Sequence, residues 1–152
     1  MPAPAASLSL RSHRDDLPAL LAWVRGEVES RSIEGRQAIV LELAVEELGL
    51  NAMTHGRPAQ GEGRVDFRLE PTSVAGELRL VIEDRGPAFD PTLLAPPAME
   101  SAIEDRPIGG LGVHLVRTMA RVSYQRIGDR NRVEVVVSAA ATDGAARPGP
   151  SA

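Results

Sequence analysis

The sequence predicts an α+β fold, a two-layer α/β sandwich whose mixed, mostly antiparallel sheet is covered by helices on one face. Alternating apolar and polar residues indicate strands near both ends of the chain. A long middle segment instead places apolar residues at helical spacing. The resulting order is strand, helix, helix, strand, strand, long loop, helix, strand, strand, and it predicts helices packed as a layer on one sheet.

The first half of the chain is expected to form one strand and two helices. Residues 7–11 (SLSLR) alternate as a half-buried strand does. Residues 17–28 carry an apolar stripe with a period of about 3.6 residues. Residues 36–55 form the longest periodic segment, and Gly56 followed by Pro58 is typical of a helix end.

The second half is expected to form four strands and one helix around a long loop. The strands are predicted over residues 64–70, 77–83, 123–127 and 132–138. The loop, residues 84–108, contains five prolines and has no clear periodicity. A loop of this length in a compact domain is usually functional or mobile. Glycines follow it, and a helix is predicted over residues 113–121.

Length and charge indicate one domain without an affinity for polyanions. The chain has 152 residues, enough for a single core, which we expect over residues 5–138, with a disordered tail over residues 139–152. Its net charge of -4 gives no attraction to nucleic acid or to an anionic membrane. The sequence has no long apolar run and no signal-peptide pattern. We therefore expect a cytoplasmic protein that contacts neither nucleic acid nor membrane.

Two residue types are missing from the sequence, and their absence excludes several mechanisms. There is no cysteine, which excludes disulfides, thiolate catalysis and zinc–thiolate sites. All 17 basic residues are arginine, which excludes a Walker A lysine, the strand lysine of eukaryotic-type kinases and Schiff-base chemistry. The three histidines have no metal-ligand spacing, so no zinc site is predicted.

The first motif with chemical potential lies in the long helix, within AVEELGLNAMTHG. Glu47, Asn51 and His55 are four residues apart and stack along one side of a helix. Asn51 offers a neutral oxygen suited to Mg²⁺, and Glu47 could take a proton from a nearby hydroxyl or water. Alternatively, the stretch is an ordinary helix end whose solvated face carries Glu42 and Glu46.

The second motif, VIEDRGPAFDP, follows an apolar strand. Asp84 at the strand end could accept a hydrogen bond from an exocyclic amino group such as that of adenine. Gly86 would let the backbone approach a flat ring closely. The alternative is a common strand-to-loop turn, because Asp-x-Gly is frequent in turns.

The third motif, IGGLGVHLV, ends the long loop and begins a helix. Gly110 and Gly112 leave backbone N–H groups accessible at a helix N-terminus, where the helix dipole favours an anion. The motif lacks the dinucleotide-binding spacing and does not follow a strand, so a Rossmann fold is rejected. The alternative is a simple turn into a helix.

Taken in order, the three motifs resemble the GHKL (Bergerat-type) ATPase fold that is shared by histidine kinases, gyrase and MutL. Within that fold the chain resembles the stand-alone anti-sigma-factor serine kinases of bacteria, the RsbW and SpoIIAB type. The resemblance covers about residues 5–138 and implies ATP and Mg²⁺ as cofactors. One departure is Ala88, where the wider superfamily often has a second glycine after Gly86.

The resemblance implies roles for the helix and strand residues. Glu47 would be the general base and Asn51 the Mg²⁺ ligand. Asp84 would bind the adenine amino group, with Gly86 beside it in the turn.

The resemblance also implies a lid over the phosphates of ATP. Residues 90–108 would form this lid, and Arg106 is its candidate cation for the γ-phosphate. Gly110, Leu111 and Gly112 would hold the phosphates.

The function implied is an ATP-dependent protein serine/threonine kinase that is also an anti-sigma factor. Its expected partners are a STAS-type anti-anti-sigma protein, which it phosphorylates, a sigma factor, which it sequesters, and a second copy of itself in a homodimer. One alternative is an ATP-binding regulatory module that binds partners without phosphotransfer. Another is a GHKL domain that hydrolyses ATP or acts in a different signalling pathway.

Overall fold

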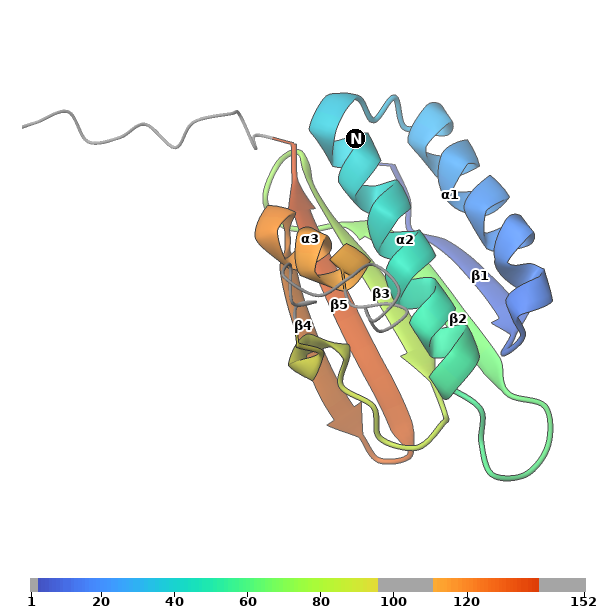
Figure 1. The fold of residues 1–152 in the computed structure, drawn as a ribbon. Coiled ribbons are helices and arrows are strands. Elements are labelled where there is room, and N and C mark those ends of the chain that lie inside the picture. Colours follow the sequence, from blue (N-terminus) through green and yellow to red (C-terminus); the bar gives the residue numbers. More distant parts are fainter. Residues whose placement is uncertain (1–2, 96–110, 140–152) are drawn as a thin grey trace, which may run out of the picture.

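Residues 3–95 and 111–139 are described by the computed structural model of the chain, shown in Figure 1. The strands are β1 (Ala6–Arg11), β2 (Arg64–Pro71), β3 (Glu77–Asp84), β4 (Arg121–Ile127) and β5 (Arg130–Ser138). The helices are α1 (Leu17–Ser30), α2 (Gly35–His55) and α3 (Leu111–Met119). Single turns of 3-10 helix at Arg14–Asp16 and Pro91–Leu93 precede α1 and follow β3.

The strands form one five-stranded sheet with the order β1-β2-β3-β5-β4. Each neighbouring pair in this sheet is antiparallel, so the described sheet is fully antiparallel rather than mixed. The reason is that β5 lies between β3 and β4, which separates two strands that run in the same direction. The predicted α+β class, with a helical layer on the sheet, is confirmed.

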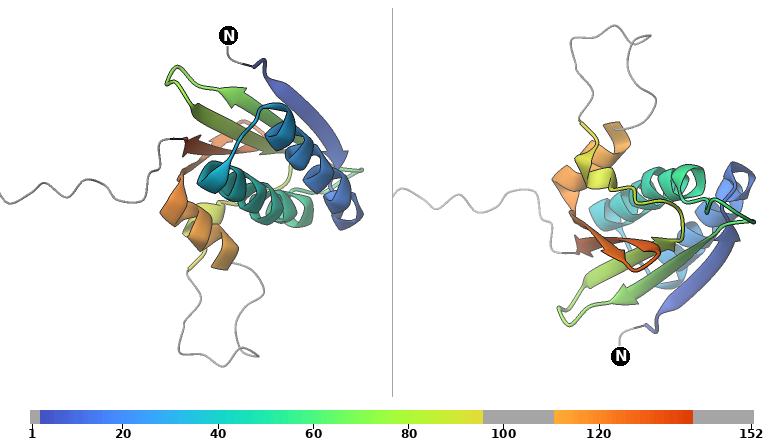
Figure 2. Two further views of the ribbon diagram at one scale, coloured as in Figure 1. Left: turned by 90° about the horizontal axis from the view of Figure 1, so that it is seen from above. Right: turned by 90° about the horizontal axis from the view of Figure 1, so that it is seen from below.

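The helices lie on one face of the sheet, as the two views of Figure 2 show. Buried apolar side chains of α1, α2 and the inward face of the strands form the core between the layers. Its fully buried members include Leu20, Val40, Leu41, Val45, Phe67 and Leu80. Burying a side chain of this size contributes about 1.5–3 kcal/mol, so this interface is the main stabilising feature of the fold.

Gly49 lies in the interior of α2 and allows close packing in two directions. A Cβ atom placed there would lie 2.6 Å from Cδ2 of Leu20 and 3.4 Å from Cε1 of Phe67. The glycine thus lets α1 and the sheet both approach α2 more closely than a side chain would allow.

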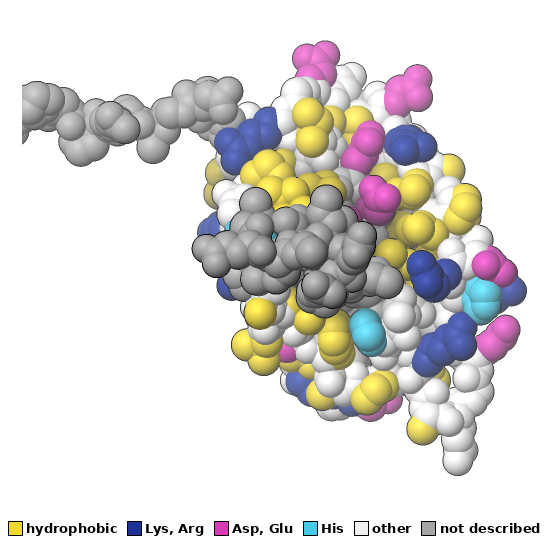
Figure 3. Space-filling model, viewed as in Figure 1, with side chains coloured by type: hydrophobic (Ala, Val, Ile, Leu, Met, Phe, Trp, Pro, Cys, Tyr) yellow, Lys and Arg dark blue, Asp and Glu magenta, His cyan; other side chains and the backbone are white. Residues whose placement is uncertain are grey.

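The outward face of the sheet is charged. Arg130 and Arg132 both pair with Glu83, and Arg68 pairs with Glu70 across 2.9 Å. The arginine side chains of these pairs are 29 % to 48 % exposed, so each pair contributes only about 0–1 kcal/mol and adds little to stability. Over the helical face, Figure 3 shows arginine side chains interspersed with acidic ones among the described residues.

The start of α3 differs from its prediction. The helix begins at Leu111 and not at residue 113, and β4 already begins at Arg121. Leu111 and Gly112 therefore belong to the first helical turn, while Val113 and Val116 are buried in the core. Within residues 3–95 and 111–139, none of the helices has the length and apolar character needed to cross a bilayer.

Candidate nucleotide-binding site

The second half of α2 carries the first predicted site residues on one side. Because α2 is continuous from residue 35 to residue 55, Glu47, Asn51 and His55 follow one another at one-turn intervals. Glu47 and Asn51 are half-buried and His55 is exposed, whereas the adjacent Leu48 and Ala52 face the core. The polar line thus borders the core without entering it.

Glu47 lies directly against the first turn of α3. A Cβ atom at Gly112 would overlap the carboxyl group of Glu47, at Cδ and Oε1. Only a glycine permits this approach, and it places the carboxyl group of Glu47 against the first described turn of α3. The structure therefore joins the first and third motifs, which are far apart in sequence.

The local environment makes Glu47 a better proton acceptor than an ordinary glutamate. Burial raises the pKa of its carboxyl group above the ordinary value, and the nearby charge of Glu46 raises it further. A carboxylate with a raised pKa takes a proton more readily at neutral pH, which is what a general base requires.

Asn51 has an unsatisfied polar group. Its Nδ2 atom is buried and has no hydrogen-bond partner among the described residues. A buried donor without a partner costs about 1–3 kcal/mol, which fits a side chain whose surroundings a ligand completes. The oxygen of the same amide suits Mg²⁺, which takes one or two protein ligands and fills its remaining positions with water and phosphate oxygens.

Asp84 is the last residue of β3 and is 8 % exposed. Its Oδ1 atom accepts hydrogen bonds from the backbone N–H of Gly86 at 2.9 Å and from Nδ2 of Asn131 at 2.9 Å. Among the described residues, no hydrogen bond to Oδ2 is found. The side chain is therefore held by one oxygen and leaves the other as an acceptor.

Two glycines bring the end of α2 against the turn that follows β3. A Cβ atom at Gly86 would lie 2.6 Å from Cα of Gly56, and one at Gly56 would lie 2.6 Å from Cγ of Asp84. Next to this crossing, the ring of His55 stacks on that of Phe89, with centroids 4.2 Å apart and an interplanar angle of 19°. The first and second motifs thus meet at one end of the sheet.

Sequence reasoning missed Asn131, because the strands were predicted over residues 123–127 and 132–138 and the residues between them, which form the turn signal GDRN, were left out of both. The residue is 2 % exposed, lies on β5 and is the register partner of Asp84. It faces inward like Val133 and Val135, the alternate residues that follow it. A polar residue at an inward position of an alternating strand was the available signal.

Several predicted residues cannot be placed in this site. Arg106, Gly110 and most of the expected lid lie outside the described residues. Leu111 is the first residue of α3 and is 45 % exposed, adjacent to Gly112. Of the predicted phosphate-binding residues, only Gly112 is therefore seen in contact with Glu47.

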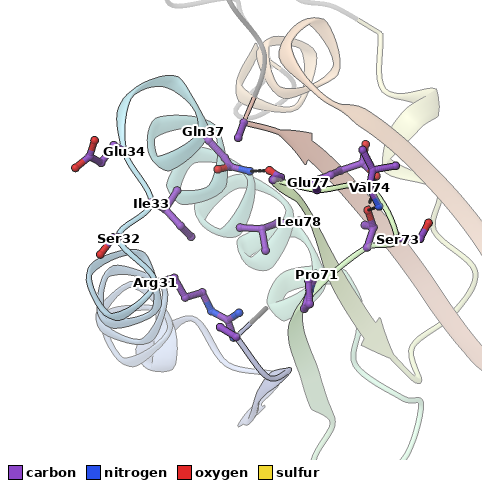
Figure 4. Close-up of a pocket in the computed structure, with 15 residues that line it drawn as sticks. Arg31, Ser32, Ile33, Glu34, Gln37, Pro71, Ser73, Val74, Glu77 and Leu78 are labelled. Carbon is purple, nitrogen blue, oxygen red and sulfur yellow. Dashed lines mark hydrogen bonds between the residues drawn. The ribbon is translucent and has the colours of Figure 1, made fainter. Parts of the chain in front are cut away.

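A cavity of about 760 Å³ lies elsewhere, beside the first turn of α2. Figure 4 shows Gln37 on one side of it and the β2–β3 hairpin on the other. Nε2 of Gln37 donates to the carbonyls of Gly76 at 2.9 Å and Val137 at 3.0 Å, so this amide fixes the hairpin. Glu47 is ten residues further along α2, about 15 Å away, and the cavity includes no predicted site residue.

The fold and the site define an ATPase domain of the GHKL class. The family of the histidine kinase-like ATPase domain matches residues 10–137, and the chain belongs to this family. Among curated proteins, none matches the chain.

Two solved structures are similar to the chain. One is the crystal structure of the RsbU and RsbW domains of Rv1364c from Mycobacterium tuberculosis, with a TM-score of 0.59, 14% identity, and 90% of this chain covered. The chain spans only 32% of that longer protein chain. The other is the Acinetobacter baumannii histidine kinase AdeS, with a TM-score of 0.46, 13% identity, and 88% and 68% of the two chains covered. The first likeness supports the same fold at low sequence identity.

Proposed function

We propose that the chain is an ATP-dependent protein serine/threonine kinase that also acts as an anti-sigma factor. The observation that carries the proposal is the position of Glu47, a carboxylate of raised pKa that lies against the N-terminal turn of α3. A domain that only bound nucleotide would have no use for a base at the point where phosphates are expected.

The residues of the chain would share the work of phosphotransfer. Asp84 would hold the adenine amino group, and the first turn of α3 at Gly112 would face the phosphates. Glu47 would accept the proton of a serine or threonine hydroxyl on the partner protein. The oxygen of that hydroxyl would bond to the γ-phosphorus of ATP as the bond to ADP breaks and ADP leaves. Asn51 would hold Mg²⁺, which neutralises charge on the phosphates when bound. The acceleration would come mainly from positioning and charge stabilisation.

The proposed substrate is a STAS-type anti-anti-sigma protein, and the proposed regulatory target is a sigma factor. Membership of the histidine kinase-like ATPase family supports the ATP chemistry. Similarity in fold to a protein with an RsbW domain supports the choice of pathway. We further propose that the protein works as a cytoplasmic homodimer.

Phosphate transfer to a purified STAS-type protein tests the proposal. Wild-type protein with Mg-ATP should transfer labelled phosphate to the partner. Glu47→Gln should bind ATP but transfer no phosphate. Glu46→Gln is the control and should retain transfer, because Glu46 is the neighbouring residue and its side chain is exposed. Wild-type protein that binds ATP but labels no STAS-type protein would contradict the kinase and favour the regulatory module. Failure to bind ATP would contradict the nucleotide chemistry itself.

A further inference from the structure

Asn131 uses both ends of its side-chain amide inside the protein. Its Oδ1 atom accepts hydrogen bonds from the backbone N–H of Phe89 at 3.2 Å and from the hydroxyl of Tyr124 at 2.6 Å. Its Nδ2 atom donates to Oδ1 of Asp84 and to the carbonyl oxygen of Pro87, both at 2.9 Å. The amide thus connects β4 and β5 to the end of β3 and to the loop that follows.

The chemistry of these partners allows one orientation of the amide. A backbone N–H can only donate, so the N–H of Phe89 must face Oδ1 of Asn131. The carbonyl of Pro87 can only accept, so it must face Nδ2. An amide turned by 180° would set its N–H against the N–H of Phe89 and its oxygen against the oxygens of Asp84 and Pro87, whereas the hydroxyl of Tyr124 could adapt to either orientation. The hydrogen-bond network therefore fixes the donor toward Asp84.

This orientation determines what Asp84 can offer a ligand. Oδ1 of Asp84 already receives two hydrogen bonds, one from Asn131 and one from the N–H of Gly86. The remaining oxygen is an acceptor with no donor beside it among the described residues. Such a group matches an amino group on a base and opposes a carbonyl oxygen at the same position.

We infer that Asn131, oriented by Tyr124, is a positioning residue that makes the site selective for a 6-amino purine over a 6-oxo purine. It acts through Asp84 and does not itself touch the base. This inference rests on the ATP binding proposed above, and it adds the residue that determines base selectivity.

Three nucleoside triphosphates that differ at the N1–C6 edge of the purine test the inference; the unsubstituted purine differs from ATP at position 6 alone, and the 6-oxo purine also has an N1–H donor. ATP carries an amino group at position 6, inosine triphosphate a carbonyl oxygen, and purine riboside triphosphate a hydrogen atom. Calorimetry gives the dissociation constant of each with the whole 152-residue chain. The wild-type protein should bind ATP at least about tenfold more tightly than either analogue, the value of one hydrogen bond to a charged group.

Asn131→Asp is the decisive variant, because it keeps the acceptor for Phe89 and Tyr124 but removes the donor to Asp84. Two carboxyl groups then share a proton, and the pair can donate as well as accept. We expect the preference for ATP over inosine triphosphate to fall by about tenfold. Tyr124→Phe removes one restraint on the amide and should lower the preference by about threefold.

Arg130→Gln is the matched control, since its guanidinium contacts Glu83 on the outward face of the sheet. It should leave the preference unchanged. Equal weakening of all three ligands by Asn131→Asp, with the preference intact, would show a purely structural role and overturn the inference. If that variant does not fold, an unchanged preference in Tyr124→Phe overturns it instead. A wild-type protein that binds none of the ligands would refute the proposed function together with this inference.

Discussion

The carboxyl group of Glu47 and the backbone of Gly112 are in direct contact across the boundary between α2 and α3. The contact joins the residue proposed as the base to the turn proposed for the phosphates. Any side chain at position 112 must displace one of the two.

Gly112→Ala is therefore expected to impair function more than stability. The new Cβ would push the carboxyl group of Glu47 from its position, and because this group is the end of a flexible, half-buried side chain, the displacement costs the fold little. Phosphate transfer should fall by more than about tenfold, as a labelling assay would measure. Gly26→Ala in α1 is the control, because its Cβ would meet nothing within 4 Å and should slightly stabilise the helix. Equal transfer rates in the two variants would contradict the proposed geometry.

The pH dependence of transfer follows from the raised pKa of Glu47. The base must be ionised, so the rate should fall as the pH drops through a value above the ordinary 4.5 of a glutamate. Burial is the larger cause of the raised pKa, and Glu46→Gln removes only the smaller one, the charge repulsion, so the variant should move this acidic limb to lower pH without abolishing the shift. A pH–rate profile checks both statements, and a limb that stays in place would exclude Glu46 as a cause.

The same pKa shift predicts how Glu47 affects stability. A carboxyl group whose pKa is raised by folding favours the folded state below the unfolded pKa of 4.5, and this contribution is lost as the pH rises through the folded pKa. Glu47→Gln should accordingly melt no lower than wild type at neutral pH, although it loses transfer. A clear fall in its Tm at pH 7 would contradict this assignment.

Two glycine variants separate packing from ligand binding. Gly86→Ala places a Cβ 2.6 Å from backbone atoms of Gly56, which have no side-chain freedom to move away. Gly49→Ala meets the flexible end of Leu20 at 2.6 Å, in the core and away from Asp84. Both should lower Tm, but only Gly86→Ala should weaken ATP binding to the folded protein, by about tenfold or more. Calorimetric titration below both melting temperatures distinguishes the two variants.

Removal of Mg²⁺ tests the role of Asn51. ATP affinity should decrease when the metal is chelated in wild type, and Asn51→Ala should lose most of this metal-dependent increment. Thr54→Ala is the control on the next turn, because its hydroxyl contacts only the Leu50 carbonyl, at 2.8 Å, in the described structure. An increment of wild-type size in Asn51→Ala would exclude Asn51 as a ligand of the metal.

The sequence predicted the local structure well because each element carries its own periodicity. The stripe of Glu47 and Asn51 could be inferred because both lie on one helix, where spacing determines direction. The predicted start of α3 lies two residues too late, because a glycine such as Gly112 disfavours a helix locally. The glycine is needed at this position because the carboxyl group of Glu47, which is distant in sequence, packs against it.

Asn131 could not be inferred for a related reason. Its neighbours in sequence form a turn signal, while its hydrogen bond to Asp84 spans 47 positions of the chain. Local sequence patterns give no information about which oxygen of Asp84 accepts a hydrogen bond from Asn131. That hydrogen bond depends on the register between β3 and β5, which pairs Asp84 with Asn131 only in the folded chain.

The position of β5 in the sheet also determines how late in synthesis the domain can complete its fold. This strand is the last one that the structure describes, yet it lies between β3 and β4 and carries the partner of Asp84. During synthesis, the ribosome must therefore release nearly the whole domain before the sheet can close. Until then β3 lacks its neighbour on that side, and Asp84 lacks the hydrogen bond from Asn131.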